Sequence, residues 1–328
     1  MKIIVIKLGA LGDVIRTTPL AEALKKKYPD SQLVWVTKKE SVPLLEGHTY
    51  IEQVFSVPYK TSEKFDALYN FDIDDEATTL ASEIKADKKY GFYKEGGYAM
   101  AFNPGAEYYL NTLFDDQLKK ANKRTYQEMM FEAAELPYSK ESCMISMNKK
   151  DRLYAETFAQ NNKINTEKLI GIHVGASPRW PSKTWDESCI IDFIKLAKKK
   201  GYEILVFGGA AEQEKMSEMK EKLKELKINV FYQEAGTSTK QFAALVGICR
   251  YMVCSDSFAL HISLALKKKT AALFFVTSPN EVEGYGLLAK MISPRLHEFF
   301  PEKSDKYDKE LTKTIHPEDV LDALEDLK

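Results

Sequence analysis

The stretch IIVIKLGALGDVIRTTPL, residues 3–20, has the pattern of a strand followed by a helix. Residues 3–6 are a continuous apolar run, which is typical of a strand that is covered on both faces of a parallel sheet. Gly9 and Gly12 interrupt this run, and from Asp13 to residue 27 the apolar residues recur at helical spacing. The stretch therefore predicts a βα unit, with its glycine-containing turn at the carboxyl end of the first strand.

The same alternation continues along the chain and restarts after a polar, helix-like stretch at residues 149–162. Strands are expected at residues 33–36, 54–57, 67–71, 169–174, 204–207, 230–232, 252–254 and 270–276. Helices are expected at residues 80–84, 126–136, 187–200, 212–226, 240–247, 258–266 and 318–327. We predict an α/β protein of two Rossmann-like domains, residues 1–150 and 151–328, whose parallel sheets face each other across a cleft. The last helix is expected to pack back on the N-terminal domain.

Composition excludes several classes of function. The 47 Lys and Arg are balanced by 48 Asp and Glu, which argues against a nucleic-acid partner. No apolar stretch approaches the roughly 20 residues of a membrane span, and the N-terminus lacks the pattern of a secretion signal, so we expect a cytoplasmic protein. The four cysteines and five histidines lack the spacing of a zinc site, so no metal site is predicted and the cysteines are expected to be reduced.

The first loop with chemical potential spans residues 7–19. Gly9 and Gly12 permit a close approach of a ligand to the backbone, and Asp13 stands at the start of the helix. Asp13 is equally compatible with a plain role at the helix N-terminus, where the dipole favours an acid. A dinucleotide-binding loop is disfavoured because Lys7 occupies the position of its first glycine and no acid follows the second strand.

The second loop, residues 171–185, follows the first strand of the second domain. Its small residues can expose backbone N–H groups, and Arg179 and Lys183 supply cations that suit a diphosphate. Other side chains of this loop are more typical of packing: Trp180 and Trp185 at the domain interface, and His173 in the core.

The third loop, residues 254–261, again joins a strand to a helix. The backbone N–H groups of residues 257–260 would face an anion there. Asp256 and Ser257 are also common helix caps, and that interpretation remains open. The convergence of three such loops at strand ends favours a phosphate-binding function.

Six segments carry a resemblance to a known family: GDVIRTTPL (12–20), YQEMMFEAAEL (126–136), GASPRWPSKTW (175–185), GGAAE (208–212), SDSFALHISLAL (255–266) and SPNEVEGYG (278–286). In their order and separation they closely resemble glycosyltransferase family 9, the heptosyltransferases of lipopolysaccharide core synthesis, and the match spans nearly the whole chain. The resemblance implies a GT-B fold and an inverting, metal-independent glycosyltransferase without a cofactor, which uses a nucleotide-diphosphate sugar such as ADP-heptose. It also implies a lipid-linked glycan acceptor and a peripheral contact with the cytoplasmic face of the inner membrane.

The resemblance assigns roles by position. Asp13 becomes the general base, Lys183 neutralises the donor diphosphate, and Glu212 accepts hydrogen bonds from the donor ribose. The donor-binding set as a whole is Gly175, Ser177, Lys183, Gly208, Glu212, Asp256, Ser257, Phe258, Ala259 and His261. The acceptor-binding set on the N-terminal domain is Gly12, Arg16, Lys123 and Arg124.

The chain departs from the family at one position, and three rival functions stay open. Phe258 stands where many members of the family have glycine, which could narrow the site and change the sugar that is accepted. Asp72 and Asp74 form a DxD triplet, which a metal-dependent transferase of the other major fold would use. Since fold does not fix function, a nucleotide-sugar epimerase or hydrolase of the same architecture is a second rival, and an inactive nucleotide- or glycan-binding relative is a third.

Overall fold

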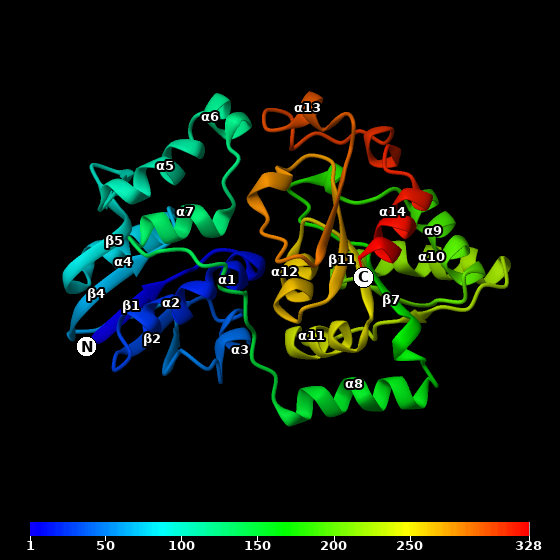
Figure 1. The fold of residues 1–328 in the computed structure, drawn as a ribbon, viewed down its shortest axis with the longest axis horizontal. Helices are drawn as coiled ribbons and strands as arrows, with labels where there is room; N and C mark the ends of the chain where they lie inside the picture. Colours follow the sequence, from blue (N-terminus) through cyan, green and yellow to red (C-terminus); the bar gives the residue numbers. More distant parts are fainter. Residues whose placement is uncertain (328) are drawn as a thin grey trace. The chain divides into compact units, whose positions relative to one another are not determined.

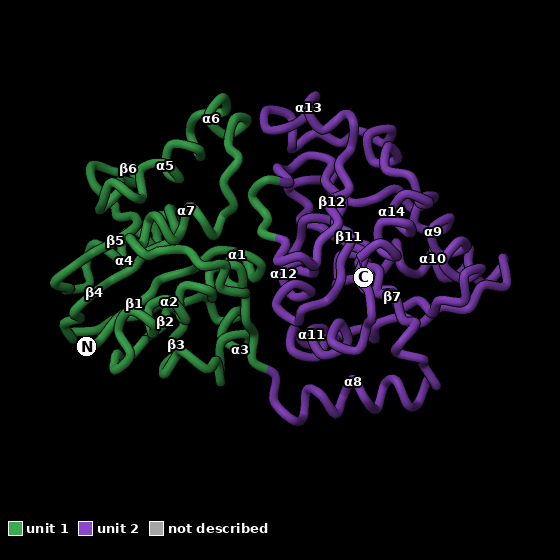
Figure 2. The backbone as a smooth tube through the Cα atoms, in the orientation of Figure 1, with its two compact units in different colours: residues 1–146, 280–283 green, residues 147–279, 284–328 purple. Residues whose placement is uncertain are grey.

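The computed structural model describes residues 1–327 and divides into two compact units (Figure 2). Unit 1 comprises Met1–Ser146 and Asn280–Glu283, and unit 2 comprises Met147–Pro279 and Gly284–Lys328. Each unit contains one six-stranded sheet with helices packed on it. The predicted fold class, two α/β domains built on parallel sheets, is confirmed.

The sheet of unit 1 has the order β3-β2-β1-β4-β5-β6. Its strands are β1 (Lys2–Ile6), β2 (Gln32–Thr37), β3 (Gln53–Ser56), β4 (Lys64–Asn70), β5 (Lys85–Glu95) and β6 (Tyr98–Ala101). All neighbours are parallel except β5 and β6, which pair antiparallel. Gly96 and Gly97 join them with φ values of 57° and 88°, the left-handed backbone that two-residue hairpin turns require.

The apolar run at the start of the chain is explained by burial on both faces of this sheet. Ile3 and Val5 belong to one hydrophobic cluster, whereas Ile4 and Ile6 belong to another. The helices of unit 1 are α1 (Leu11–Thr17), α2 (Pro19–Lys27), α3 (Val42–Leu45), α4 (Asp75–Glu83), α5 (Pro104–Thr112), α6 (Asp116–Ala121) and α7 (Tyr126–Ala133) (Figure 1). The single helix expected after Gly12 is two helices, because Pro19 lacks the N–H that a continuous helix would use and instead starts α2.

The sheet of unit 2 has the order β12-β11-β10-β7-β8-β9 and is parallel throughout. Its strands are β7 (Leu169–His173), β8 (Glu203–Phe207), β9 (Phe231–Tyr232), β10 (Tyr251–Ser255), β11 (Lys269–Phe274) and β12 (Leu288–Ile292). The α-helices are α8 (Lys149–Asn161), α9 (Glu187–Lys199), α10 (Gln213–Glu225), α11 (Thr239–Ile248), α12 (Phe258–Ala265), α13 (Leu296–Phe299) and α14 (Pro317–Asp326). The side chains of α9, α10 and α14 join the main core of this unit.

Two segments with expected interface roles contribute to the core of unit 2. The apolar side chains Val320, Leu321 and Leu324 of α14 lie in this core. Trp185 lies there too. It is 3% exposed within the same core, and its Nε1 donates a hydrogen bond to Ile315 O at 3.1 Å.

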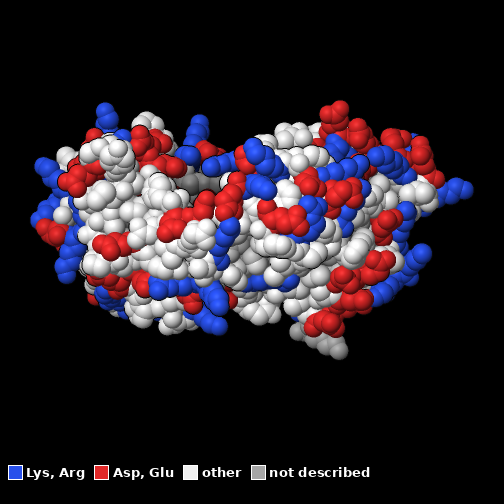
Figure 3. All heavy atoms as spheres, turned by 90° about the horizontal axis from the view of Figure 1, so that it is seen from above, with Lys and Arg blue, Asp and Glu red and all other residues white. Residues whose placement is uncertain are grey.

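The surface and the thiols agree with the composition. Figure 3 shows Lys and Arg side chains intermingled with Asp and Glu on the visible face, without a broad surface of one sign. Within residues 1–327 no helix is both long and apolar enough to cross a membrane. All four cysteines are free thiols, and three of them are buried.

Candidate functional site

Asp13 lies in the first turn of α1, just beyond the carboxyl end of β1. Its Oδ1 forms an ion pair with Arg16 Nη2 at 2.7 Å, and its side chain is 33% exposed. The Arg16 guanidinium lies 3.7 Å from the centre of the Tyr126 ring, and the Tyr126 hydroxyl forms a hydrogen bond with Thr17 Oγ1 at 2.9 Å. Tyr126 on α7 therefore holds the cation that is paired with Asp13, while the carboxylate itself stays accessible.

Asp72 lies beneath this turn and was not predicted to support it. Its carboxylate accepts hydrogen bonds from Lys7 Nζ at 2.6 Å, from Gly9 N at 2.9 Å and from Leu8 N. A Cβ added to Gly9 would lie 3.1 Å from Asp13 Cβ and 3.3 Å from Asp72 Oδ1. These hydrogen bonds hold the turn after β1 in place. Because Gly9 has no side chain, its backbone fits between the carboxylates of Asp13 and Asp72.

The DxD hypothesis receives no support from this geometry. Asp72 is 8% exposed and its oxygens serve Lys7 and two backbone amides, whereas Asp74 is an exposed residue at the start of α4. The two carboxylates therefore have different surroundings and different roles. Among the described residues, 1–327, there is also no group of three or more His, Cys, Asp and Glu that could hold a metal ion.

The charges around Asp13 are strongly coupled. Burial alone would lower the pKa of Lys7, but Asp72, Tyr126 and Asp13 together raise it above its usual range. Burial likewise opposes the charge of Arg16, and Asp13 and Tyr126 outweigh it and raise the pKa of Arg16. Both cations consequently remain charged beside Asp13 at any physiological pH.

Lys123 and Arg124, the other predicted acceptor residues, lie between α6 and α7. Lys123 is exposed, and Arg124 pairs with Glu132 Oε2 at 2.5 Å and stacks on the Tyr108 ring at 3.8 Å. The segment Asn280–Glu283 also belongs to unit 1 and interacts with both predicted acceptor regions, the loop of Lys123 and the surroundings of Arg16. Asn280 Nδ2 donates to Asn122 O at 3.1 Å, and Glu281 contributes to the raised pKa of Arg16.

In unit 2 the structure brings several predicted donor residues together at the carboxyl ends of β7, β8 and β10. Lys183 Nζ and Asp256 Oδ2 form an ion pair at 3.1 Å, and their side chains are only 13% and 17% exposed. Lys183 ends η2 (Pro181–Lys183) and Asp256 follows β10 directly. Loops that are 73 positions apart in the chain therefore supply one paired site.

The part of the site next to the Lys183–Asp256 pair is formed by Glu212, Gly175 and Gly208. Glu212 ends η3 (Ala210–Glu212), and its Oε2 accepts a hydrogen bond from Gly209 N at 2.8 Å. A Cβ on Gly175 would lie 2.5 Å from Glu212 Cδ, and one on Gly208 would lie 2.4 Å from Met216 Sδ. The absence of a side chain at Gly175 leaves room for the Glu212 carboxylate, and its absence at Gly208 leaves room for the Met216 side chain on α10. Ser177, in contrast, is exposed on the loop after Gly175.

Ser257 is the N-cap residue of α12 but makes no capping bond through its side chain. Its Oγ is buried and has no hydrogen-bond partner among residues 1–327. Because buried polar atoms are rarely left without a partner, and because the first N–H groups of a helix are also free, this end of α12 has the character of an anion site. The Ser257 side chain therefore does not cap the helix, which was the alternative that the sequence left open.

The remaining residues of this loop pack inward. Ala259 is fully buried and His261 is 7% exposed. The Phe258 ring lies 5.4 Å from that of Phe242, which also contacts His173 at 5.8 Å and Phe207 at 5.3 Å. The Phe258 ring therefore packs against an aromatic cluster. Burial in this cluster lowers the pKa of His173 to about 4, so its imidazole is neutral at physiological pH.

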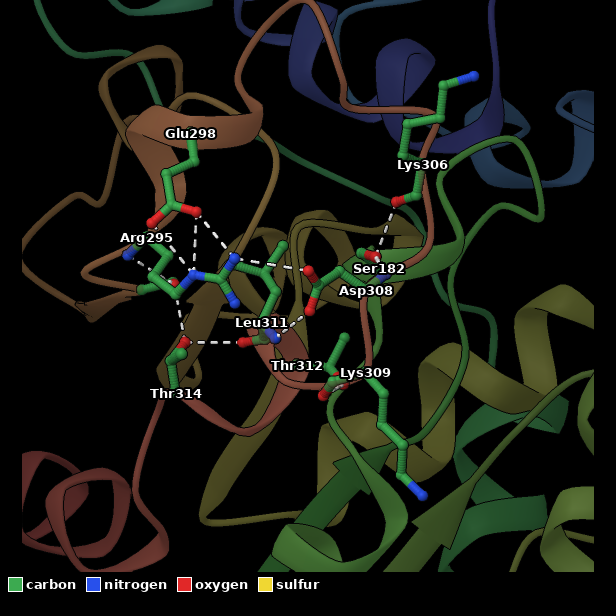
Figure 4. A network of polar contacts seen from close by, with 10 residues as sticks. Ser182, Arg295, Glu298, Lys306, Asp308, Lys309, Leu311, Thr312 and Thr314 are labelled. Atoms are coloured by element: carbon green, nitrogen blue, oxygen red, sulfur yellow. Dashed lines mark hydrogen bonds and ion pairs between the residues drawn. The ribbon is translucent and has the colours of Figure 1, made fainter.

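A polar network that the sequence analysis missed anchors the loop of Lys183 (Figure 4). The buried Ser182 accepts a hydrogen bond from Asp308 N at 2.8 Å and donates one to Lys306 O at 2.8 Å. Asp308 in turn accepts from Leu311 N at 2.8 Å and pairs with Arg295 at 3.5 Å. The position of Lys183 is thus set by residues more than 100 positions later, which no local pattern reveals.

Two further polar atoms at the end of β9 lack partners. Tyr232 Oη and Gln233 Oε1 are buried and have no hydrogen-bond partner among the described residues. Gln233 N donates to Val206 O at 3.0 Å, which fixes this segment beside β8 and its Gly208-Gly209 turn. Burial raises the pKa of Tyr232 to about 12, so it remains a hydrogen-bond donor. The sequence signal that could have identified Tyr232 and Gln233 is their position at the end of the predicted strand that follows the GGAAE segment.

Comparison with known proteins gives consistent matches. The family model described as glycosyltransferase family 9 (heptosyltransferase) matches residues 61–310. Lipooligosaccharide heptosyltransferase 2 of Campylobacter jejuni is 27% identical over 329 residues, covering 97% of this chain and 95% of that protein.

Solved structures match over the whole chain. The glycosyltransferase family 9 structure from Veillonella parvula has a TM-score of 0.77 at 19% identity, covering 99% of this chain and 96% of its own. The ADP-heptose lipopolysaccharide heptosyltransferase II of Escherichia coli has a TM-score of 0.68 at 19% identity, with coverages of 100% and 98%. At this identity the structural likeness establishes a shared fold.

Proposed function

The chain belongs to glycosyltransferase family 9 and is a glycosyltransferase, and we propose that it transfers heptose from ADP-heptose to a lipopolysaccharide-core glycan with inversion at the anomeric carbon. The observation that carries this proposal is the paired Lys183 and Asp256 beside the unpartnered Ser257 Oγ, at the start of α12. An ammonium, a hydroxyl and free helix N–H groups are the ligands that a diphosphate requires. The similarity to the heptosyltransferases of Campylobacter jejuni and Escherichia coli supports heptose as the sugar.

In this proposal unit 2 binds the donor. Lys183, Ser257 and the first N–H groups of α12 hold the diphosphate, while Asp256 orients Lys183 and accepts from a sugar hydroxyl. Glu212 accepts from the ribose, and Tyr232 and Gln233 border the base. The other donor residues shape the loops through their small size or inward packing: Gly175, Ser177, Gly208, Phe258, Ala259 and His261.

Unit 1 binds the acceptor and supplies the base. An acceptor hydroxyl gives its proton to Asp13 as its oxygen bonds to the anomeric carbon, and the bond from that carbon to the diphosphate oxygen breaks. Gly12, Arg16, Lys123 and Arg124 would contact the acceptor. Because the acceptor is lipid-linked, we further propose that the protein is cytoplasmic and works at the cytoplasmic face of the inner membrane.

Lys183→Ala is expected to weaken ADP binding by roughly 10- to 100-fold, the range of one lost charge-assisted hydrogen bond. The loss is reinforced because Asp256 would then face the diphosphate without its cation. Calorimetric titration with ADP measures this effect. Lys195→Ala is the matched control, since Lys195 pairs with Asp192 on the exposed side of α9. A dissociation constant within twofold of the wild-type value would remove Lys183 from the donor site.

The reaction is proposed to need no metal ion. The developing charge on the departing diphosphate would be balanced by Lys183 and by the N-terminal dipole of α12, which can take the place of a divalent cation. Turnover is therefore expected to be the same in EDTA and in added Mn²⁺. A loss of activity in EDTA that Mn²⁺ restores would show that a metal participates.

Product analysis tests the function itself. The protein is incubated with ADP-heptose and a lipid-linked core acceptor, and the products are identified by mass spectrometry and NMR. Transfer predicts a lengthened acceptor, free ADP and an inverted anomeric configuration. An epimerase would change the donor sugar without an acceptor, a hydrolase would release free heptose, and an inactive binding protein would leave both substrates intact.

A further inference from the structure

Tyr109 lies on α5, which packs against α7 in unit 1 (Figure 1). Its ring meets the Tyr126 ring edge to face, with the two centres 5.9 Å apart, and it lies 5.8 Å from the ring of Phe92 on β5. Tyr126 also carries the Arg16 guanidinium on its ring, and Arg16 is the ion-pair partner of Asp13. Two ring contacts therefore hold the Tyr109 side chain close to the Asp13–Arg16 pair.

The charged groups around the proposed base interact with Tyr109. Against the effect of burial, Tyr109 helps to raise the pKa values of Lys7 and Arg16. Burial raises the pKa of Tyr109 itself above its usual range, and Tyr126 and Asp13 add to this increase, whereas the two cations oppose it. The hydroxyl therefore keeps its proton at physiological pH, so it can both donate and accept a hydrogen bond.

The Tyr109 hydroxyl is not used by the fold. The side chain is partly exposed, and within residues 1–327 its hydroxyl neither forms a hydrogen bond nor is fully enclosed. The Tyr126 hydroxyl, in contrast, is bonded to Thr17 Oγ1. Arg16 Nε adds a buried N–H group that has no partner among the described residues. Because such groups usually have partners in a folded protein, the two of them indicate that a polar group of a ligand binds beside Asp13.

We propose that Tyr109 binds the acceptor, with its hydroxyl hydrogen-bonded to an oxygen of the acceptor sugar other than the one that Asp13 deprotonates. This role rests on the proposed transfer function and adds to it a residue that orients the acceptor. Lys7, the nearby cation, is already engaged by Asp72 and by Phe71 O. Since a sugar carries several hydroxyl groups, a second contact is needed to bring one of them to the base. A hydroxyl without an internal bond can supply that contact without weakening the fold.

Tyr109→Phe tests the proposal, because it removes the hydroxyl and keeps the ring contacts with Phe92 and Tyr126. The KM for the lipid-linked core acceptor is expected to rise about three- to tenfold, the range of one lost hydrogen bond. The kcat, the affinity for ADP and the thermal unfolding midpoint should match those of the wild type, since a contact made equally in the ground and transition states affects KM alone. Tyr93→Phe is the control and should change none of these values, because the Tyr93 hydroxyl bonds to Glu95 at the exposed end of β5.

Titration of the ADP-bound protein with the same acceptor gives a second readout that needs no turnover. Weaker acceptor binding by Tyr109→Phe, with ADP binding unchanged, supports the role of Tyr109 whichever sugar is transferred. Acceptor affinity and KM within about 1.5-fold of the wild-type values would overturn the role of Tyr109 while leaving the proposed function in place. A lower unfolding midpoint or weaker ADP binding would overturn it as well, since the hydroxyl would then hold the fold. A wild-type protein that neither binds nor lengthens the core acceptor would contradict the proposed function itself, and the role of Tyr109 with it.

Discussion

Asp13→Ala is expected to lower kcat by roughly 100-fold or more while the dissociation constant of ADP stays within twofold of the wild-type value. The Asp13 side chain is 33% exposed in the first turn of α1, whereas the nearby Asp72 is enclosed by Lys7 and two amides. The proposed donor residues belong to the other unit, so ADP binding is expected not to depend on Asp13.

The measurement is a steady-state assay of heptose transfer together with a titration of ADP. Asp13→Asn separates proton transfer from shape, since it keeps the size of the side chain and loses the basic oxygen, and it should be as slow as the alanine variant. Glu22→Gln on α2 is the control, because Glu22 pairs with Lys26 on the surface of the same unit. A kcat within threefold of the wild-type value in either Asp13 variant would rule out general-base catalysis by this residue.

Arg16 sets a condition on this mechanism. Its guanidinium forms an ion pair with the Asp13 carboxylate at 2.7 Å, so the proposed base is already engaged by a cation before an acceptor binds. Tyr126 and Glu281 also favour the charged form of Arg16.

The sequence predicted the fold well where a strand lies in the middle of a sheet. Residues 3–6 are buried on both faces, so every position is apolar and the pattern is plain. β5 (KADKKYGFYKE) was missed because its outer half carries charges and its sheet neighbour β6 is a short edge strand. β12 was missed for the same reason, since it lies at the edge and its alternate residues are exposed.

The sequence predicted individual residues of the candidate site, but not the contacts between them. Lys183 and Asp256 were assigned from the resemblance, whereas their ion pair required the topology that places β10 beside β7. Ser182 and Asp308 had no readable signal, because their contact joins two loops that are far apart in the chain. Polar tethers of this kind are set by tertiary structure, and periodicity describes only which face of an element is buried.

Asp72→Ala is expected to destabilise unit 1 by about 3–5 kcal/mol, the usual cost of removing one partner from a buried ion pair. The side chains of Lys7 and Asp72 are 4% and 10% exposed, so the ammonium that remains could not be solvated in place. Lys7 Nζ would keep its hydrogen bond to Phe71 O but lose its carboxylate, and the amides of Leu8 and Gly9 would lose their acceptor. Urea unfolding of the full chain, with hydrogen exchange in β1 and β4 to identify the unit, measures the loss.

Two further variants separate charge from hydrogen bonding. Asp72→Asn retains an oxygen for the amides but not the charge, so it should lose less stability than the alanine variant. Asp87→Ala removes the partner of Lys64 on the surface of the same unit, where both side chains are more than half exposed, and should change stability by less than about 1 kcal/mol. If Asp72→Ala cost no more stability than Asp87→Ala, the buried pair could not be what fixes the turn.

Because that turn carries Asp13, the Asp72→Ala variant should also lower kcat at temperatures where it remains folded, while its affinity for ADP is kept. A stable variant with full kcat would show that Asp13 is positioned by α1 and Tyr126 alone.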